Sequence, residues 1–195
     1  FLILMNSWDN PANKAVTTGM PTKLGVWGQQ TRDHAIEYMA LPPKRVEIIG
    51  SAQFDLYREP LDCSKNSILS EFNLPNDKPI LLYGGVSKSI NESRHLLILE
   101  DLIETNQIPD CHILYRPHPW RGALVEGEQD FFELQFKHIT FDPNMLSFYK
   151  NTINTSTYNQ FYCADYSVTK RFLSVITGTI STLSTILLET LIQGK

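Results

Sequence analysis

Three short groups of residues in this 195-residue chain carry side chains or backbone suited to holding a charged group. The first is Gly84-Gly85-Val86-Ser87, which directly follows an apolar run. Glycines let backbone N–H groups come close to a phosphate, so this turn could cradle one. Its spacing matches neither G-x-G-x-x-G nor G-x-x-x-x-G-K-[ST], and a Gly-Gly pair after a strand is more often a simple turn.

The second group is Arg116-Pro117-His118-Pro119-Trp120, which follows the next apolar run. The two prolines restrict the backbone around the histidine, so less entropy is lost when the imidazole engages a ligand. His118 could then donate a hydrogen bond to a phosphate oxygen or protonate a leaving group. A rigid turn, whose histidine only caps a neighbouring carbonyl, is an equally weighted alternative.

The third group is Ser181-Thr182-Leu183-Ser184-Thr185, followed by a helical pattern that carries Glu189. Hydroxyls and free N–H groups at a helix N-terminus form an anion site, to which the helix dipole contributes about 0.3–1 kcal/mol. Glu189 could accept hydrogen bonds from the two hydroxyls of a ribose. The commoner outcome of such a pattern is that Ser184 or Thr185 is only an N-cap and Glu189 a solvated carboxylate.

Each group must be positioned by the elements around it. Apolar runs at 80–83, 111–115 and 139–141 are short enough to be strands, and helical patterns between them favour a parallel sheet with crossover helices. An open parallel sheet binds its ligand at the carboxyl ends of its strands, and we expect all three groups to lie there.

Three further patterns concern helices. The S-x-x-E capping box Ser89-Ile90-Asn91-Glu92 predicts a helix start ahead of Leu96 and Ile103. Residues 172–177 either close a helix or form a fourth strand, and a small polar run follows at 177–185. An apolar face at 186–192 predicts a last helix, with Gly194 as its C′ residue.

The first sixty residues form a separate pattern. Runs at 1–5, 24–27 and 46–49 predict strands, and a helix over 31–41 should end before Pro42-Pro43. Residues 51–65 lack periodicity and read as a linker. We therefore expect two domains, 1–60 and 61–195. Because the chain starts inside a strand without Met and stops directly after a helix, we expect a piece of a longer protein.

Composition excludes several classes. Lys plus Arg is 17 and Asp plus Glu is 21, so the net charge of −4 gives no general attraction for nucleic acid. Three scattered cysteines without a C-x-x-C pair indicate neither a disulfide framework nor a thiolate zinc site, so a reducing cytoplasm is expected. No apolar run approaches the roughly 20 residues that span a bilayer.

Taken together, these residues resemble a family. Gly-Gly after one strand, R-P-H-P after the next, and S-T-x-x-x-E-x-x-x-x-G-K at Ser184 to Lys195 resemble the donor-binding domain of GT-B type glycosyltransferases of surface-polysaccharide synthesis. CDP-glycerol glycerophosphotransferases, bacterial sialyl- and Kdo-transferases and UDP-N-acetylglucosamine 2-epimerases have similar patterns. Residues 7–10, 26–28 and 49–55 resemble the end of the N-terminal domain in the same group, although Ala15 stands where we expect a glycine.

The resemblance implies an α/β fold with a Rossmann-like parallel sheet. Residues 1–60 would be the end of the acceptor-side domain, and 61–195 a donor-binding domain that is incomplete at its C-terminus. The implied site residues are Gly84 and Gly85 at the diphosphate, Arg116 and His118 at the donor phosphates with His118 as the catalytic group, Ser184 and Thr185 at phosphate, and Glu189 at the ribose.

The implied activity is transfer of a sugar from a nucleotide-activated donor to a glycan or lipid-linked acceptor, with no further cofactor. The absence of an Asp-x-Asp triplet agrees with a site that uses no metal. The implied location is the cytoplasm, with peripheral attachment to the inner face of the membrane left open, and nucleic acid is not an expected partner. A sugar-nucleotide 2-epimerase, a CDP-glycerol glycerophosphotransferase and a noncatalytic nucleotide-sugar binding module are the alternatives.

Overall fold

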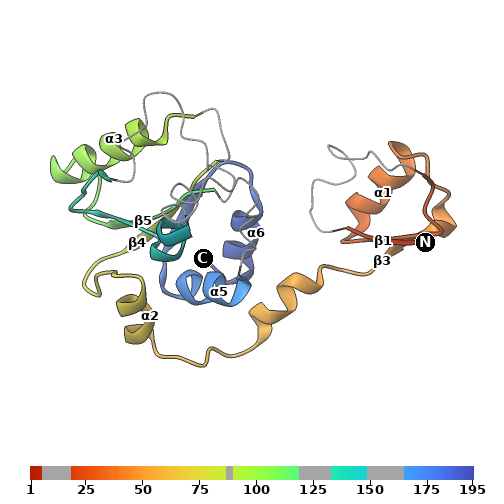
Figure 1. Ribbon diagram of the computed structural model, residues 1–195, viewed down its shortest axis with the longest axis horizontal. Coiled ribbons are helices and arrows are strands. Elements are labelled where there is room, and N and C mark those ends of the chain that lie inside the picture. The colour runs from red at the N-terminus through yellow and green to blue at the C-terminus, as the bar shows by residue number, and fades with distance from the viewer. Residues whose placement is uncertain (6–18, 87–89, 119–132, 149–164) are drawn as a thin grey trace. The chain divides into compact units, whose positions relative to one another are not determined.

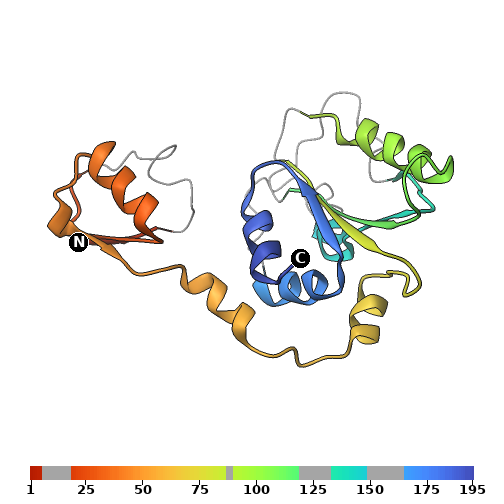
Figure 2. The same ribbon diagram turned by 180° about the vertical axis from the view of Figure 1, so that it is seen from behind.

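The computed structural model describes residues 1–5, 19–86, 90–118, 133–148 and 165–195. They form two compact units, Phe1–Glu59 and Pro60–Lys195. Figures 1 and 2 show the units from opposite sides. The acceptor-side and donor-side roles expected for the two parts stay predictions.

The first unit is a small parallel sheet with a helix packed on it. β1 (Leu2–Leu4), β2 (Lys23–Val26) and β3 (Val46–Ile48) pair in the order β1-β2-β3. Each of the three strands overlaps an apolar run that the sequence marked as a strand, and β2 begins one residue before its run, at Lys23. The buried core joins the sheet to helix α1 (Gln29–Glu37) and consists of Leu24, Val26, Ala35, Leu41 and Val46.

Helix α1 differs from its predicted bounds at both ends. It starts at Gln29 because Gly28 is the N-cap, and the Gly28 N–H donates to the Thr31 hydroxyl at 3.0 Å. It ends before Ala40, which adopts a left-handed φ of 52°. The predicted linker also contains structure, because Ala52–Arg58 form the 3-10 helix η2. The boundary between the two compact units, Glu59 and Pro60, lies inside the predicted linker.

The second unit contains a four-stranded parallel sheet. β4 (Ile80–Gly84), β5 (His112–Arg116), β6 (Ile139–Phe141) and β7 (Gly178–Ser181) lie in the order β6-β5-β4-β7. The chain therefore moves outward from β4 to β6 and then returns to place β7 on the other side of β4. Both units are thus α/β with parallel sheets, and the second is Rossmann-like, as predicted.

Helices cover both faces of this second sheet. Alternate residues of a strand point to opposite faces, and on β5 the two sets are Ile113 with Tyr115 and Leu114 with Arg116. Helix α3 (Glu92–Glu104) packs Leu96 and Ile103 on the first set. Helices α2 (Lys65–Glu71) and α5 (Tyr166–Val175) lie on the other face, as both views show. The Phe72 and Phe172 rings join them in an edge-to-face contact, with 5.6 Å between the ring centroids.

The C-terminal part of the chain contains the element that the sequence did not mark. Residues 172–177 close α5 instead of forming a strand, and the fourth strand is β7, inside the run predicted as small and polar. Helix α6 (Thr185–Ile192) follows β7. Gly194 has a φ of 71°, which confirms its predicted position as the residue after the helix cap.

The predicted capping box of α3 was wrong. Its N-cap is Asn91, whose side-chain oxygen accepts a hydrogen bond from the Arg94 N–H at 2.9 Å. Ser89, the cap expected from sequence, lies outside the described residues, and Glu92 is the first residue of the helix. Among the described residues, no helix has the length and apolar character needed to cross a membrane.

The pH dependence of stability should depend on His112 in β5. Burial lowers its pKa to about 4, with the charges of Lys78 and His138 as smaller causes and Asp110 opposing them. The ring is held by a 2.8 Å contact with the Thr140 hydroxyl. An unfolded histidine titrates near 6.5, so between pH 6.5 and 4 the unfolded state binds more protons. This contribution to stability is complete above about pH 6.5 and is lost as the pH falls toward 4.

We therefore expect His112→Gln to lose less stability than the parent chain between pH 7 and pH 4.5, by up to about 3 kcal/mol. Urea unfolding of both proteins at the two pH values measures the difference. Carboxylates that titrate in the same pH range affect both proteins equally, so their contribution drops out of the difference in stability. Parallel loss of stability in the two proteins would contradict a buried, neutral His112.

Candidate functional site

The order in which strands are added to the second sheet reverses at β4, and this defines one edge of the sheet as the candidate site. At the carboxyl ends of β4 and β7 the following segments leave toward opposite sides, and open α/β sheets bind ligands at such a point. Gly84 and Ser181 are register partners there, and the Ser181 hydroxyl donates to the Gly84 carbonyl at 3.0 Å. The first and third sequence groups therefore meet at this edge.

Gly84 allows a close approach of β7 and α6 to β4. A Cβ at this position would lie 2.9 Å from Ser181 Oγ and 3.1 Å from Ile186 Cγ2, inside normal contact distance. Ser181 was not among the predicted site residues. Its pairing with Gly84 could not be recognised from sequence, because β7 itself carried no strand pattern.

The turn after β4 holds a buried carboxylate. The Gly85 N–H donates to the Arg116 carbonyl at 2.9 Å, and the Val86 N–H donates to Glu92 Oε1 at 2.6 Å. The other Glu92 oxygen accepts a hydrogen bond from the Tyr115 hydroxyl, and Glu92 is only 1% exposed. Both N–H groups that would cradle a phosphate are thus already engaged beside a negative charge.

Gly85 is explained by this same carboxylate. A Cβ there would lie 2.8 Å from Glu92 Oε2 and 3.1 Å from the backbone nitrogen of His118. The glycine makes room for Glu92 below the turn and for the segment after β5 beside it. The structure accounts for both glycines by packing, and their contact with a diphosphate stays a prediction.

Arg116 is buried and already paired within the fold. Its guanidinium forms a buried ion pair with Asp142 and lies 4.9 Å over the Phe172 ring, on the face covered by α5. The other Asp142 oxygen accepts hydrogen bonds from the N–H groups of Asn144 and Met145, at the start of a helical segment over 143–148. This positive charge is neutralised by Asp142, so we leave Arg116 out of the proposed site.

His118 lies beside the glycine turn, with its backbone nitrogen next to the Gly85 position. The residue is half-buried, and burial lowers the pKa of its imidazole below the ordinary value. The ring is therefore mainly neutral at pH 7 and can donate one hydrogen bond and accept another. Pro117 is buried, whereas Pro119 lies outside the described residues.

The third group forms the start of α6. Ser184 is the N-cap in extended conformation, as the sequence indicated, but its hydroxyl makes no capping hydrogen bond. Thr185 is the first helical residue. The hydroxyl of Ser184 is thus free of the role that an N-cap side chain usually has.

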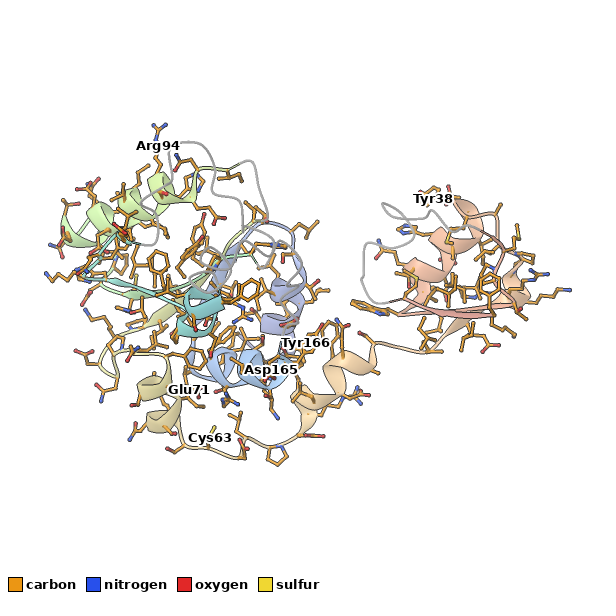
Figure 3. All side chains as sticks on the ribbon, in the orientation of Figure 1. Tyr38, Cys63, Glu71, Arg94, Asp165 and Tyr166 are labelled. Atoms are coloured by element: carbon orange, nitrogen blue, oxygen red, sulfur yellow. The ribbon has the colours of Figure 1, made fainter. Side chains whose placement is uncertain are left out.

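Glu189 is not a solvated carboxylate. It is 5% exposed, and its charge acts on Tyr166 at the start of α5, which is labelled in Figure 3. Burial is the main cause that raises the Tyr166 pKa, and the Glu189 charge adds to it. The ordinary alternative for Glu189 was therefore wrong, although its burial alone does not assign it a ligand.

The structure thus brings Gly84, Gly85 and His118 to the same edge as the start of α6. It places Arg116 in the interior. Two buried carboxylates at this edge, Glu92 and Asp142, were missed as organising residues. The S-x-x-E pattern did mark Glu92 as a hydrogen-bond acceptor near a helix start, but for a different N–H group.

Comparisons with known proteins give little beyond the fold. No family model matches the chain, and no curated protein matches it. Among solved structures, the chain is similar to the crystal structure of a glycosyltransferase from Rickettsia africae ESF-5, with a TM-score of 0.44 and 16% sequence identity. The match covers 89% of this chain and 43% of that chain, so this chain spans less than half the length of that protein.

The packing role of Gly85 leads to a mutational test. Gly85→Ala should destabilise the second unit by about 1–3 kcal/mol, because the new methyl group meets both the Glu92 carboxylate and backbone. Gly178→Ala is the matched control, since its Cβ would meet only Leu81 Cδ2 at an ordinary 3.7 Å. Urea unfolding measures both changes. Equal stabilities for the two variants would show that the turn is looser than described.

Proposed function

We propose that the chain is part of a glycosyltransferase whose second unit binds a nucleotide-activated sugar at the carboxyl edge of β4 and β7. The observation that carries this proposal is the strand order β6-β5-β4-β7. The order in which strands are added reverses at β4, and this point lies beside Gly84 and the start of α6. The sequence resemblance of the R-P-H-P and S-T-x-x-x-E segments supports the same placement.

The donor phosphates belong at the start of α6 in this proposal. The first N–H groups of a helix have no partner within the helix, and its dipole favours an anion there. The hydroxyls of Ser184 and Thr185 add two donors. The turn after β4 supplies a close wall but no free donor at Gly85 or Val86, since Glu92 fills the space below it. The Gly85 N–H already donates to the Arg116 carbonyl, and the Val86 N–H to Glu92.

His118 is the proposed catalytic group. Being mainly neutral, its imidazole offers a hydrogen bond to a departing phosphate oxygen without a fixed positive charge. Such a bond strengthens as negative charge develops on the leaving group, which is the condition for accelerating the reaction.

Nucleotide binding by this chain is the direct test. A thermal-shift panel of CMP, CDP, UDP, GDP and dTDP should show one base that stabilises the protein and a diphosphate that exceeds its monophosphate. A ligand at 100 times its Kd adds about 2.7 kcal/mol, which moves the unfolding temperature by several degrees. No shift with any nucleotide at millimolar concentration would contradict the proposed donor site.

The proposed ribose contact of Glu189 gives a sharper test. Glu189→Gln should weaken binding of the selected nucleotide about tenfold, because a charge-assisted hydrogen bond contributes about 1.5–3 kcal/mol. Asp77→Asn, an exposed carboxylate before β4, is the control and should bind as the parent does. Isothermal titration measures the affinities, and urea unfolding identifies any loss of fold. If the variant folds and binds the nucleotide as the parent does, Glu189 does not contact the ribose and its role is structural.

A further inference from the structure

A second group of chemically active side chains lies at the opposite, amino edge of the same sheet. Glu100 and Glu104 are one turn apart in the last part of α3, and His138 directly precedes β6. One ligand atom from each of these residues lies within 4.8 Å of those of the other two. Two carboxylates and one imidazole at this spacing can hold a single cation.

His138 is the residue that indicates a ligand. It is 9% exposed, and within the described part of the chain its ring nitrogens have no hydrogen-bond partner. The contact nearest to a bond joins Nδ1 to Asp110 Oδ1 at 3.9 Å, which is beyond hydrogen-bond length. His138 also lines an open pocket, so its imidazole is accessible to a cation that enters from solvent.

Glu100 is held in place for such a role. Its Oε1 accepts hydrogen bonds from the N–H groups of Lys137 at 2.6 Å and His138 at 3.1 Å. These bonds fix the carboxylate against the segment before β6 and still leave lone pairs on both oxygens. An outer set of hydrogen bonds of this kind is what orients the ligands in metal sites.

Glu104 provides access from solvent. It is exposed and lines an open pocket of about 400 Å³ together with His138, Asp110, Lys78 and Lys137. The positive charge of Lys78 is offset by Asp110, because Lys78 Nζ lies 2.9 and 3.0 Å from the two Asp110 carboxylate oxygens. Glu104 is also the last residue of α3, where the negative end of the helix dipole favours positive charge.

We propose that Glu100, Glu104 and His138 bind one divalent transition-metal ion, with Zn²⁺ as the best match. Imidazole and carboxylate together suit Zn²⁺ and its neighbours, whereas Ca²⁺ and Mg²⁺ prefer sets made of oxygen alone. The ion joins the end of α3 to the start of β6, at the sheet edge opposite the proposed donor site. The inference uses no residue of that site and stands without it.

The test is titration of the whole chain with Zn²⁺ by isothermal calorimetry, with Mg²⁺ in a parallel arm. Glu104→Gln removes one ligand at an exposed position, so the fold should persist and Zn²⁺ affinity should fall at least about tenfold. Asp101→Asn, an exposed carboxylate in the same helix, is the matched control and should bind as the parent does. Glu104→His keeps a ligand and should retain most of the affinity.

Zn²⁺ should also raise the unfolding temperature of the parent and of Asp101→Asn, but not that of Glu104→Gln. Circular dichroism shows whether each variant keeps its helix content. Affinity of Glu104→Gln equal to the parent would place the ion elsewhere, for example at the cysteines, and would overturn the proposal. Binding weaker than millimolar in the parent, or equal binding of Mg²⁺, would overturn it as well.

Discussion

The carboxylate of Glu92, buried below the turn after β4, is the constraint on which the arrangement of the second unit depends. It joins three segments, because it starts α3, accepts the Val86 N–H and accepts the Tyr115 hydroxyl from β5. Removing a carboxylate from water is unfavourable unless hydrogen bonds replace the lost hydration. The structure meets this need at both oxygens, and Gly85 must lack a side chain for the carboxylate to fit. A glycine pair that looks like a phosphate loop is thus explained by an internal anion.

This internal anion decides where an external one can lie. A phosphate beside Gly85 would meet a carboxylate of the same charge and N–H groups that are already bonded. At the start of α6 the local charge favours an anion instead, since the Ser184 hydroxyl makes no capping hydrogen bond and the helix presents its positive end. The buried pair of Arg116 and Asp142 acts in the same direction, because it neutralises the nearby guanidinium within the core. Local charge therefore favours the α6 side as the place for donor phosphates.

The sequence predicted most of the sheet but less of the site, for a physical reason. Strands β4 and β5 contain apolar runs, Ile80–Tyr83 and Ile113–Tyr115, and therefore leave a strong pattern. Strand β7 reads Gly-Thr-Ile-Ser and is held by pairing with β4, which no local pattern reveals. Arg116 resembled an anion ligand because its partner Asp142 lies 26 positions away along the chain. Glu189 is buried although it lies in the first turns of its helix, and its burial depends on tertiary packing that the helix pattern alone does not reveal.

The two proposed sites follow from one property of parallel α/β structure. A crossover helix runs antiparallel to its strands, so its N-terminus lies near their carboxyl ends and its C-terminus near their amino ends. The carboxyl edge therefore receives the positive ends of helix dipoles, here that of α6 beside β7, and the amino edge receives the negative ends, here that of α3 beside β6. Side chains reinforce this division, with hydroxyls at Ser184 and Thr185 and carboxylates at Glu100 and Glu104. The same backbone polarity that attracts a phosphate to one edge of this sheet thus favours a cation at the other.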